Sequence, residues 1–192
     1  MRKVKGNLQI LFVCVVITFA CLFGYLMLQN LSVELFVQWG WEVRVTENSL
    51  LEQNFWLAFL VTGIIVPVCE ELFFRFAVCS SLKLTKIPDW TIILMSAVIF
   101  MLFHGSWSQT IYQLLMGIWF AWIYLKTRKI GWTVLMHVIN NTFIVAYTSI
   151  VGNGSNVFEL SVWNVILSVS LAVVTTILVT FLIKKGIPQY EK

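Results

Sequence analysis

Long apolar runs alternate with short polar segments along the whole chain. Residues 6–30, 90–125, 130–151 and 161–183 carry no Asp, Glu, Lys or Arg, and residues 54–81 are mainly apolar. About 20 apolar residues in a helix cross the hydrocarbon core of a bilayer, so each run can form a span. Run 90–125 would make a helix of roughly 54 Å, nearly twice the core, and we place a break at its polar cluster, residues 105–109. The pattern therefore predicts an all-α membrane bundle of about six transmembrane helices.

The polar segments fit the connections of such a bundle. Residues 31–53 carry several charges and two tryptophans, and we expect a loop at the membrane interface. Residues 82–89 and 126–129 predict short turns, and residues 152–156 predict a loop of turn-forming residues. The uncharged part of run 6–30 exceeds the usual hydrophobic region of a signal peptide, so we expect it to be a retained anchor.

Basic residues lie almost entirely on one side of the predicted bundle. Of thirteen lysines and arginines, Arg44 falls on the opposite side and Arg75 lies within a span. The others lie at the two termini or directly after the predicted second and fourth spans: Arg2, Lys3, Lys5, Lys83, Lys86, Lys126, Arg128, Lys129, Lys184, Lys185 and Lys192. By the positive-inside rule, both termini are predicted to be cytoplasmic.

The composition agrees with a membrane protein. Of the 192 residues, 59% are apolar and 11% are charged, about half the charge of a soluble domain. This excludes nucleic-acid partners, soluble enzymes and secreted disulfide scaffolds, and makes membrane lipids the expected surroundings. We expect one integral membrane domain, residues 1–192, with free cysteine thiols and with its chemistry in residues 54–151.

A few polar side chains interrupt the predicted spans. Each ionisable group at membrane depth costs about 2.5–3.5 kcal/mol, so such groups usually face the protein interior and serve a function. The predicted second, third and fifth spans contain Glu70, Glu71, Arg75, His104, His137, Asn140 and Asn141. Glu71 and Arg75 are four residues apart and can pair on one helix face, whereas Glu70 points about 100° away. This spacing predicts a structural ion pair beside a free carboxylate.

Four of these groups lie at similar depth. At ~1.5 Å per residue, Glu70, His104, His137 and Asn141 lie about 12–22 Å from the basic side. A carboxylate, two imidazoles and an amide that meet there can activate a water molecule and stabilise an oxyanion. The pattern favours a hydrolase, although Glu70, His104 and His137 are also possible zinc ligands.

Three motifs resemble those of a known family. Residues 70–75 match EExxxR, Phe100 and His104 match FxxxH, and residues 137–141 match HxxxN. Their order is similar to that in the CPBP (CAAX protease and bacteriocin-processing, or Abi) family of intramembrane endopeptidases, related to type II CAAX prenyl endopeptidases. The resemblance covers residues 57–146; Phe76 departs from it, because the family often has a small residue there.

The resemblance implies hydrolysis of a peptide bond in a membrane-associated peptide or protein, which enters from the bilayer or the cytoplasmic face. It implies that Glu70 is the general base, that His104 positions the water and that His137 with Asn141 forms the oxyanion hole. Glu71, Arg75 and Phe100 are supporting residues. Family members have also been described as metalloproteases; we favour catalysis without a cofactor, because the chain has no HExxH motif. The expected location is a bacterial plasma membrane.

Two other functions fit the same residues. A non-catalytic membrane protein that binds a peptide, such as a bacteriocin self-immunity protein, would keep the motif residues for folding. A proton-coupled carrier would use Glu70 and His104 as a relay, but the chain shows no internal repeat of the kind common in transporters. Neither the substrate nor the oligomeric state is written in the sequence.

Overall fold

The computed structural model describes residues 2–41 and 49–151, together with residues 166, 170 and 177. Every element in this part of the chain is a helix, which confirms the predicted all-α class there. In chain order the elements are α1 (Arg2–Gln38), α2 (Ser49–Gln53), α3 (Phe55–Leu60), η1 (Val61–Ile65), α4 (Val66–Glu71), η2 (Leu72–Cys79), α5 (Ser80–Leu84), α6 (Asp89–Phe103), η3 (Trp107–Gln109), α7 (Thr110–Thr127) and α8 (Ile130–Val151).

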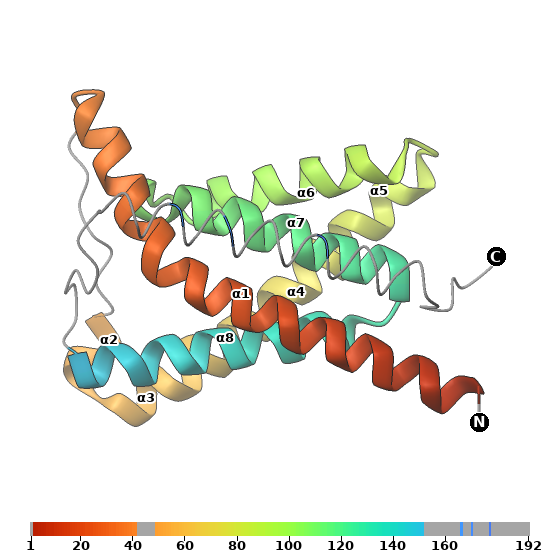
Figure 1. Ribbon diagram of the computed structural model, residues 1–192, viewed down its shortest axis with the longest axis horizontal. Helices are drawn as coiled ribbons and strands as arrows, with labels where there is room; N and C mark the ends of the chain where they lie inside the picture. Colours follow the sequence, from red (N-terminus) through yellow and green to blue (C-terminus); the bar gives the residue numbers. More distant parts are fainter. Residues whose placement is uncertain (1, 42–48, 152–165, 167–169, 171–176, 178–192) are drawn as a thin grey trace.

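The long helices run side by side (Figure 1). α6 packs against α7, α1 packs against α7 and α8, and α4 packs against α8. The start of α1, the α5–α6 turn and the α7–α8 connection lie toward one end of the bundle. Lys83 at the end of α5 and Lys86, Arg128 and Lys129 in the two connections therefore lie toward the end that the charge pattern predicts to be cytoplasmic.

Several predicted boundaries are confirmed. α8 occupies residues 130–151 as expected, and the uncharged run 90–125 is broken at residues 104–109. α6 ends at Phe103, Gly105 adopts a left-handed backbone with φ of 59°, and η3 leads into α7. Glycine occupies that conformation without steric cost, which explains why the chain turns there.

The expected loop over residues 31–53 is wrong for its first and last parts, and α2 makes Ser49–Gln53 helical. α1 is 37 residues long and continues through Gln38, so it includes residues 31–38. The side chain of Gln38 donates a hydrogen bond to Glu34, one helical turn earlier, at 3.1 Å. Polar residues at this helix end thus satisfy one another, and the helix extends beyond the apolar run.

The predicted second span is one continuous helical stretch with two wider π-helical turns, η1 and η2. Asn54 caps its start by accepting a hydrogen bond from the Leu57 backbone N–H at 3.0 Å. At the end of η1 the Val66 N–H donates to the Val61 carbonyl, five residues earlier. Pro67 follows, and its ring would clash with the carbonyl four residues back in a regular α-helix. The wider turn relieves this clash, and α4, with Glu70 and Glu71, follows directly.

Two helices in the described part are suited to crossing a membrane by length and composition, Phe55–Leu84 and Ile130–Ile150. Ile10–Cys21 and Asp89–Phe103 are shorter apolar helical segments. The expected span 161–183 and the loop 152–156 lie outside the residues that the structure describes, apart from three single positions. The described helices therefore agree with a membrane protein but contain fewer such spans than the six predicted.

Gly117 allows α6 and α7 to pack closely. A Cβ atom at this position would lie 2.9 Å from the Ala97 Cα and 3.0 Å from its Cβ. We expect Gly117→Ala to destabilise the protein by about 1–3 kcal/mol, because backbone must move. Gly131→Ala is the control, since nothing lies within 4 Å of a Cβ there. Thermal unfolding in detergent checks this prediction, and equal midpoints for the two variants would contradict it.

Candidate active site

Three helical segments bring the predicted site residues together. Glu70 and Glu71 lie at the end of α4, His104 caps the end of α6, and His137 lies in the second turn of α8. Glu71 and His137 are buried, whereas the side chains of Glu70 and His104 are 14% and 18% exposed. The site thus has a buried side and a side that reaches the surface.

The expected ion pair between Glu71 and Arg75 is present. The Arg75 Nε donates to Glu71 Oε2 at 3.1 Å, and both side chains are 0% exposed. Nη1 of Arg75 donates to the Ser96 hydroxyl on α6 at 3.0 Å. The guanidinium carbon also lies 4.9 Å from the centre of the Phe100 ring. The arginine is therefore held by a carboxylate, a hydroxyl and an aromatic face, as a buried cation requires.

Glu71 also contacts His137, which the spacing argument did not foresee. Its second oxygen, Oε1, lies 3.0 Å from His137 Nδ1. Glu71 therefore binds His137 in addition to its predicted partner Arg75. The Glu71 carboxylate can only accept a hydrogen bond, so the Nδ1 atom of His137 carries the proton of this contact. The other ring nitrogen of His137, Nε2, then faces the site.

Glu70 faces both imidazoles. Its Oε2 lies 3.5 Å from His137 Nε2, and its Oε1 lies 3.7 Å from His104 Nε2. Oε2 is buried without a hydrogen-bond partner among the described residues. The predicted meeting of Glu70, His104 and His137 is therefore observed, and Glu70 is the carboxylate that is not engaged by an arginine.

His104 is oriented by its own helix. Its Nδ1 lies 2.8 Å from the Phe100 carbonyl oxygen, and a carbonyl can only accept, so Nδ1 carries the proton. In a neutral ring, Nε2 then has a lone pair directed toward Glu70. Glu70 Oε1 and His104 Nε2 are both hydrogen-bond acceptors, and they lie too far apart for a direct hydrogen bond. This arrangement suits a water molecule that bridges them.

The Phe100 ring packs between the charged groups. Its centre lies 4.5 Å from that of His104 and 5.9 Å from that of His137, and the ring also contacts Arg75 and Phe74. It is fully buried. Phe100 therefore fixes the relative positions of two imidazoles and the guanidinium, a position that suits the supporting role implied by the resemblance.

Asn141 lies one turn beyond His137 on α8, and its Nδ2 donates to the Thr62 carbonyl at 3.2 Å. Asn141 was predicted to meet Glu70, His104 and His137, and the hydrogen bonds of the described residues join it to Thr62 and Asn140. Asn140, its neighbour, is fully buried and donates to Asn141 Oδ1 at 3.3 Å and to the Tyr112 hydroxyl. Sequence reasoning missed Tyr112, Thr62 and Ser96, since each is an ordinary polar residue without a motif.

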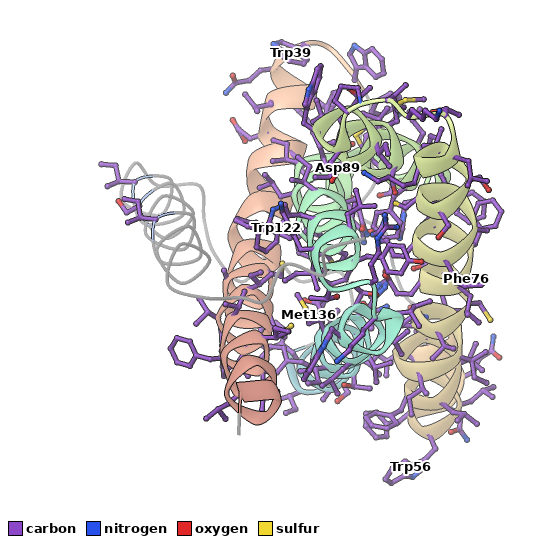
Figure 2. All side chains as sticks on the ribbon, turned by 90° about the vertical axis from the view of Figure 1, so that its right-hand side faces the viewer. Trp39, Trp56, Phe76, Asp89, Trp122 and Met136 are labelled. Atoms are coloured by element: carbon purple, nitrogen blue, oxygen red, sulfur yellow. The ribbon has the colours of Figure 1, made fainter. Side chains whose placement is uncertain are left out.

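Phe76, the departure from the family pattern, points out of the bundle. Figure 2 shows Phe76 and Trp56 projecting from the outer side of their helices, whereas Met136 lies inside. Phe76 is 61% exposed and Met136 is 1% exposed. The departure therefore leaves the packing around Glu70 unchanged.

No group of three His, Cys, Asp or Glu side chains in the described part of the chain is arranged to hold a metal ion. Glu70, His104 and His137 were the conceivable ligands, but Glu70 presents a different oxygen to each ring. The donor set does not fit a metal in this geometry, and we derive no step through one.

A comparison with protein families finds one similarity. The family described as type II CAAX prenyl endopeptidase Rce1-like matches residues 52–143, which contain all three motifs. Residues 52–143 are therefore similar to this family. The resemblance to CPBP proteases that the motifs predicted is thereby confirmed.

One curated relative supports the Rce1-like assignment. A Bacillus subtilis (strain 168) protein described as "Putative membrane peptidase YdiL" is 32% identical over 89 residues. The alignment covers 46% of this chain and 36% of the relative, so the chain spans about a third of that protein's length. No solved structure matches the chain. With its apolar helices, the chain is thus similar to membrane proteases in the broad sense.

Proposed function

We propose that the chain is an intramembrane endopeptidase that hydrolyses a peptide bond with a water molecule activated by Glu70. The observation that carries the proposal is the Glu70 carboxylate, which lies between two imidazole Nε2 atoms at 3.5 and 3.7 Å. A carboxylate that is not neutralised by an arginine can accept the proton of a water molecule.

In this mechanism the water binds between Glu70 Oε1 and His104 Nε2. Both atoms accept hydrogen bonds, so the water donates one hydrogen to each, and its lone pair is left for the substrate carbonyl. Glu70 takes one proton as the oxygen attacks, and then gives that proton to the departing amine. The base and the acid are thus one residue used twice.

His137 serves the oxyanion in its protonated form. Glu71 accepts from Nδ1 at 3.0 Å and stabilises the imidazolium, so that Nε2 also becomes a donor. His137 Nε2 and Asn141 Nδ2, one helical turn apart, then donate to the developing oxyanion.

The test compares the membrane peptides of cells that carry the native chain with those of cells that carry Glu70→Gln. We expect peptides with new termini in the native membranes only, and their sequences identify the substrate. A bound but uncleaved peptide in both membranes would favour the peptide-binding alternative instead.

The proposed topology has six spans, with both termini in the cytoplasm of a bacterium. Reporter fusions after Lys86 and Lys129 should be active as cytoplasmic reporters, because these turns carry the basic residues. Fusions after Ser49 and Asn156 should be active only as external reporters. Activity of a cytoplasm-only reporter at Asn156 would contradict the six-span arrangement.

Catalysis by Glu70 needs no metal ion in this proposal. Purified protein should therefore keep its cleavage activity after prolonged treatment with a strong chelator. Element analysis of the same sample should find no stoichiometric zinc. Activity that is lost on chelation and restored by zinc would overturn the assignment and make His104 and His137 ligands.

A further inference from the structure

Pro67 leaves the Thr62 carbonyl open to a side chain. The Val66 N–H, four residues after Thr62, donates to Val61 instead. The next residue in the widened turn is Pro67, which has no N–H. The amide of Asn141 donates to this carbonyl at 3.2 Å. A backbone acceptor on η1 thus holds the side chain that the proposed function places at the oxyanion.

The Thr62 carbonyl determines the orientation of the side-chain amides of Asn141 and Asn140. A carbonyl can only accept, so Asn141 must present its NH₂ group to it and its Oδ1 to the other side. Nδ2 of Asn140 lies 3.3 Å from that Oδ1. Asn140 therefore donates to Asn141, and its own orientation is set as well.

The chain of hydrogen bonds continues to α7. The NH₂ group of Asn140 also donates to the Tyr112 hydroxyl, which in turn donates to Met116 Sδ at 3.2 Å. Asn140, Tyr112 and Met116 are 0%, 3% and 1% exposed. Water therefore does not compete for these bonds, and the chain from Tyr112 to Thr62 has one consistent set of donors and acceptors.

A close helix approach keeps this chain short. A Cβ atom on Gly63, next to Thr62, would lie 2.9 Å from Thr142 Cγ2, next to Asn141. Glycine at this point lets α8 pack against η1, so the Asn141 side chain reaches the Thr62 carbonyl. Packing and hydrogen bonding therefore specify the same position for the Asn141 amide.

We propose that Tyr112 and Asn140 are positioning residues that fix the amide plane of Asn141 for the substrate carbonyl. The inference rests on the proposed endopeptidase function and deepens it. Asn141 is held at Oδ1 by Asn140 and through one N–H by Thr62, which leaves the second N–H in a defined direction. A donor that is fixed before the substrate arrives needs no reorganisation when charge develops on the oxyanion.

The test removes the Tyr112 hydroxyl and measures kcat and KM separately. The substrate is a synthetic peptide with the cleavage sequence found by the comparison of native and Glu70→Gln membranes. We expect Tyr112→Phe to lower kcat about tenfold and to leave KM within about twofold, because the donor acts on the transition state. Asn140→Leu, which removes the donor at similar volume, should give the same selective fall in kcat.

Tyr124→Phe is the matched control. Tyr124 is also a buried tyrosine on α7, and its hydroxyl lies 2.8 Å from the Ser80 hydroxyl, outside the site. It should show a similar change in thermal unfolding with little change in kcat. Equal losses of kcat in Tyr112→Phe and Tyr124→Phe would overturn the proposal.

A double-mutant cycle separates positioning from general loosening of the bundle. In an Asn141→Ala background, removal of the Tyr112 hydroxyl should cause no further fall in kcat, since its effect passes through Asn141. A tenfold fall that persists in this background would contradict the inference while leaving the proposed function standing. Failure of the native chain to cleave the peptide would instead overturn the proposed function, and the inference with it.

Discussion

Replacing Glu70 with glutamine is expected to lower the rate of peptide cleavage by about 10²–10⁴-fold, the usual contribution of a general base. Glutamine keeps the shape of the side chain but cannot take a proton from water. The replaced Oε2 has no hydrogen-bond partner among the described residues, so the change strands no donor. The folded protein should therefore be recovered from membranes in normal yield.

Purified native, Glu70→Gln and Glu34→Gln proteins in lipid vesicles provide the measurement. Glu34 lies on α1 and accepts from Gln38, and an amide oxygen at the same position can still accept. The control should therefore cleave at the native rate. If the Glu70→Gln protein cleaves as fast as the control, Glu70 is not the general base.

Glu71→Gln should act on stability. The variant leaves Arg75 as an uncompensated buried charge and weakens the partner of His137, and loss of one member of a buried pair costs about 3–5 kcal/mol. We expect low yield and a lower free energy of unfolding in detergent. The double variant, Glu71→Gln with Arg75→Met, should recover part of the loss, because the side chain at position 75 lies near the Phe74, Phe100 and Phe120 rings.

Denaturant unfolding of the Glu70, Glu71 and double variants checks the division of roles between the two carboxylates. The expected order of stability is native and Glu70→Gln together, then the double variant, then Glu71→Gln. Equal destabilisation by Glu70→Gln and Glu71→Gln would show that both carboxylates are structural.

Features set by local spacing could be predicted from the sequence. Residues 130–151 form one mainly apolar run without Asp, Glu, Lys or Arg, and α8 has these bounds. The four-residue spacing of Glu71 and Arg75 predicted their pair, and counting residues from the basic end predicted that Glu70, His104 and His137 meet. Each of these inferences needs only helical geometry and chain length.

Features set by contacts between helices could not be predicted. The contact of Glu71 with His137 joins residues 66 positions apart, and that of Tyr112 with Asn140 joins residues 28 apart. The π-helical turn η1 had a signal in Pro67, but its position was not determined by the apolar pattern. The extension of α1 to Gln38 arose because polar side chains there pair along the helix.

The most direct test of the central claim is cleavage of the identified peptide in ¹⁸O-labelled water by native and Glu70→Gln proteins in vesicles. Mass spectrometry of the new C-terminal carboxyl group is the measurement. We expect one ¹⁸O atom in that group for the native protein, and for Glu70→Gln a rate of product formation lower by about 10²–10⁴-fold. A native protein that binds the peptide without forming a labelled product, or a Glu70→Gln protein that forms it at the native rate, would contradict hydrolysis by a Glu70-activated water.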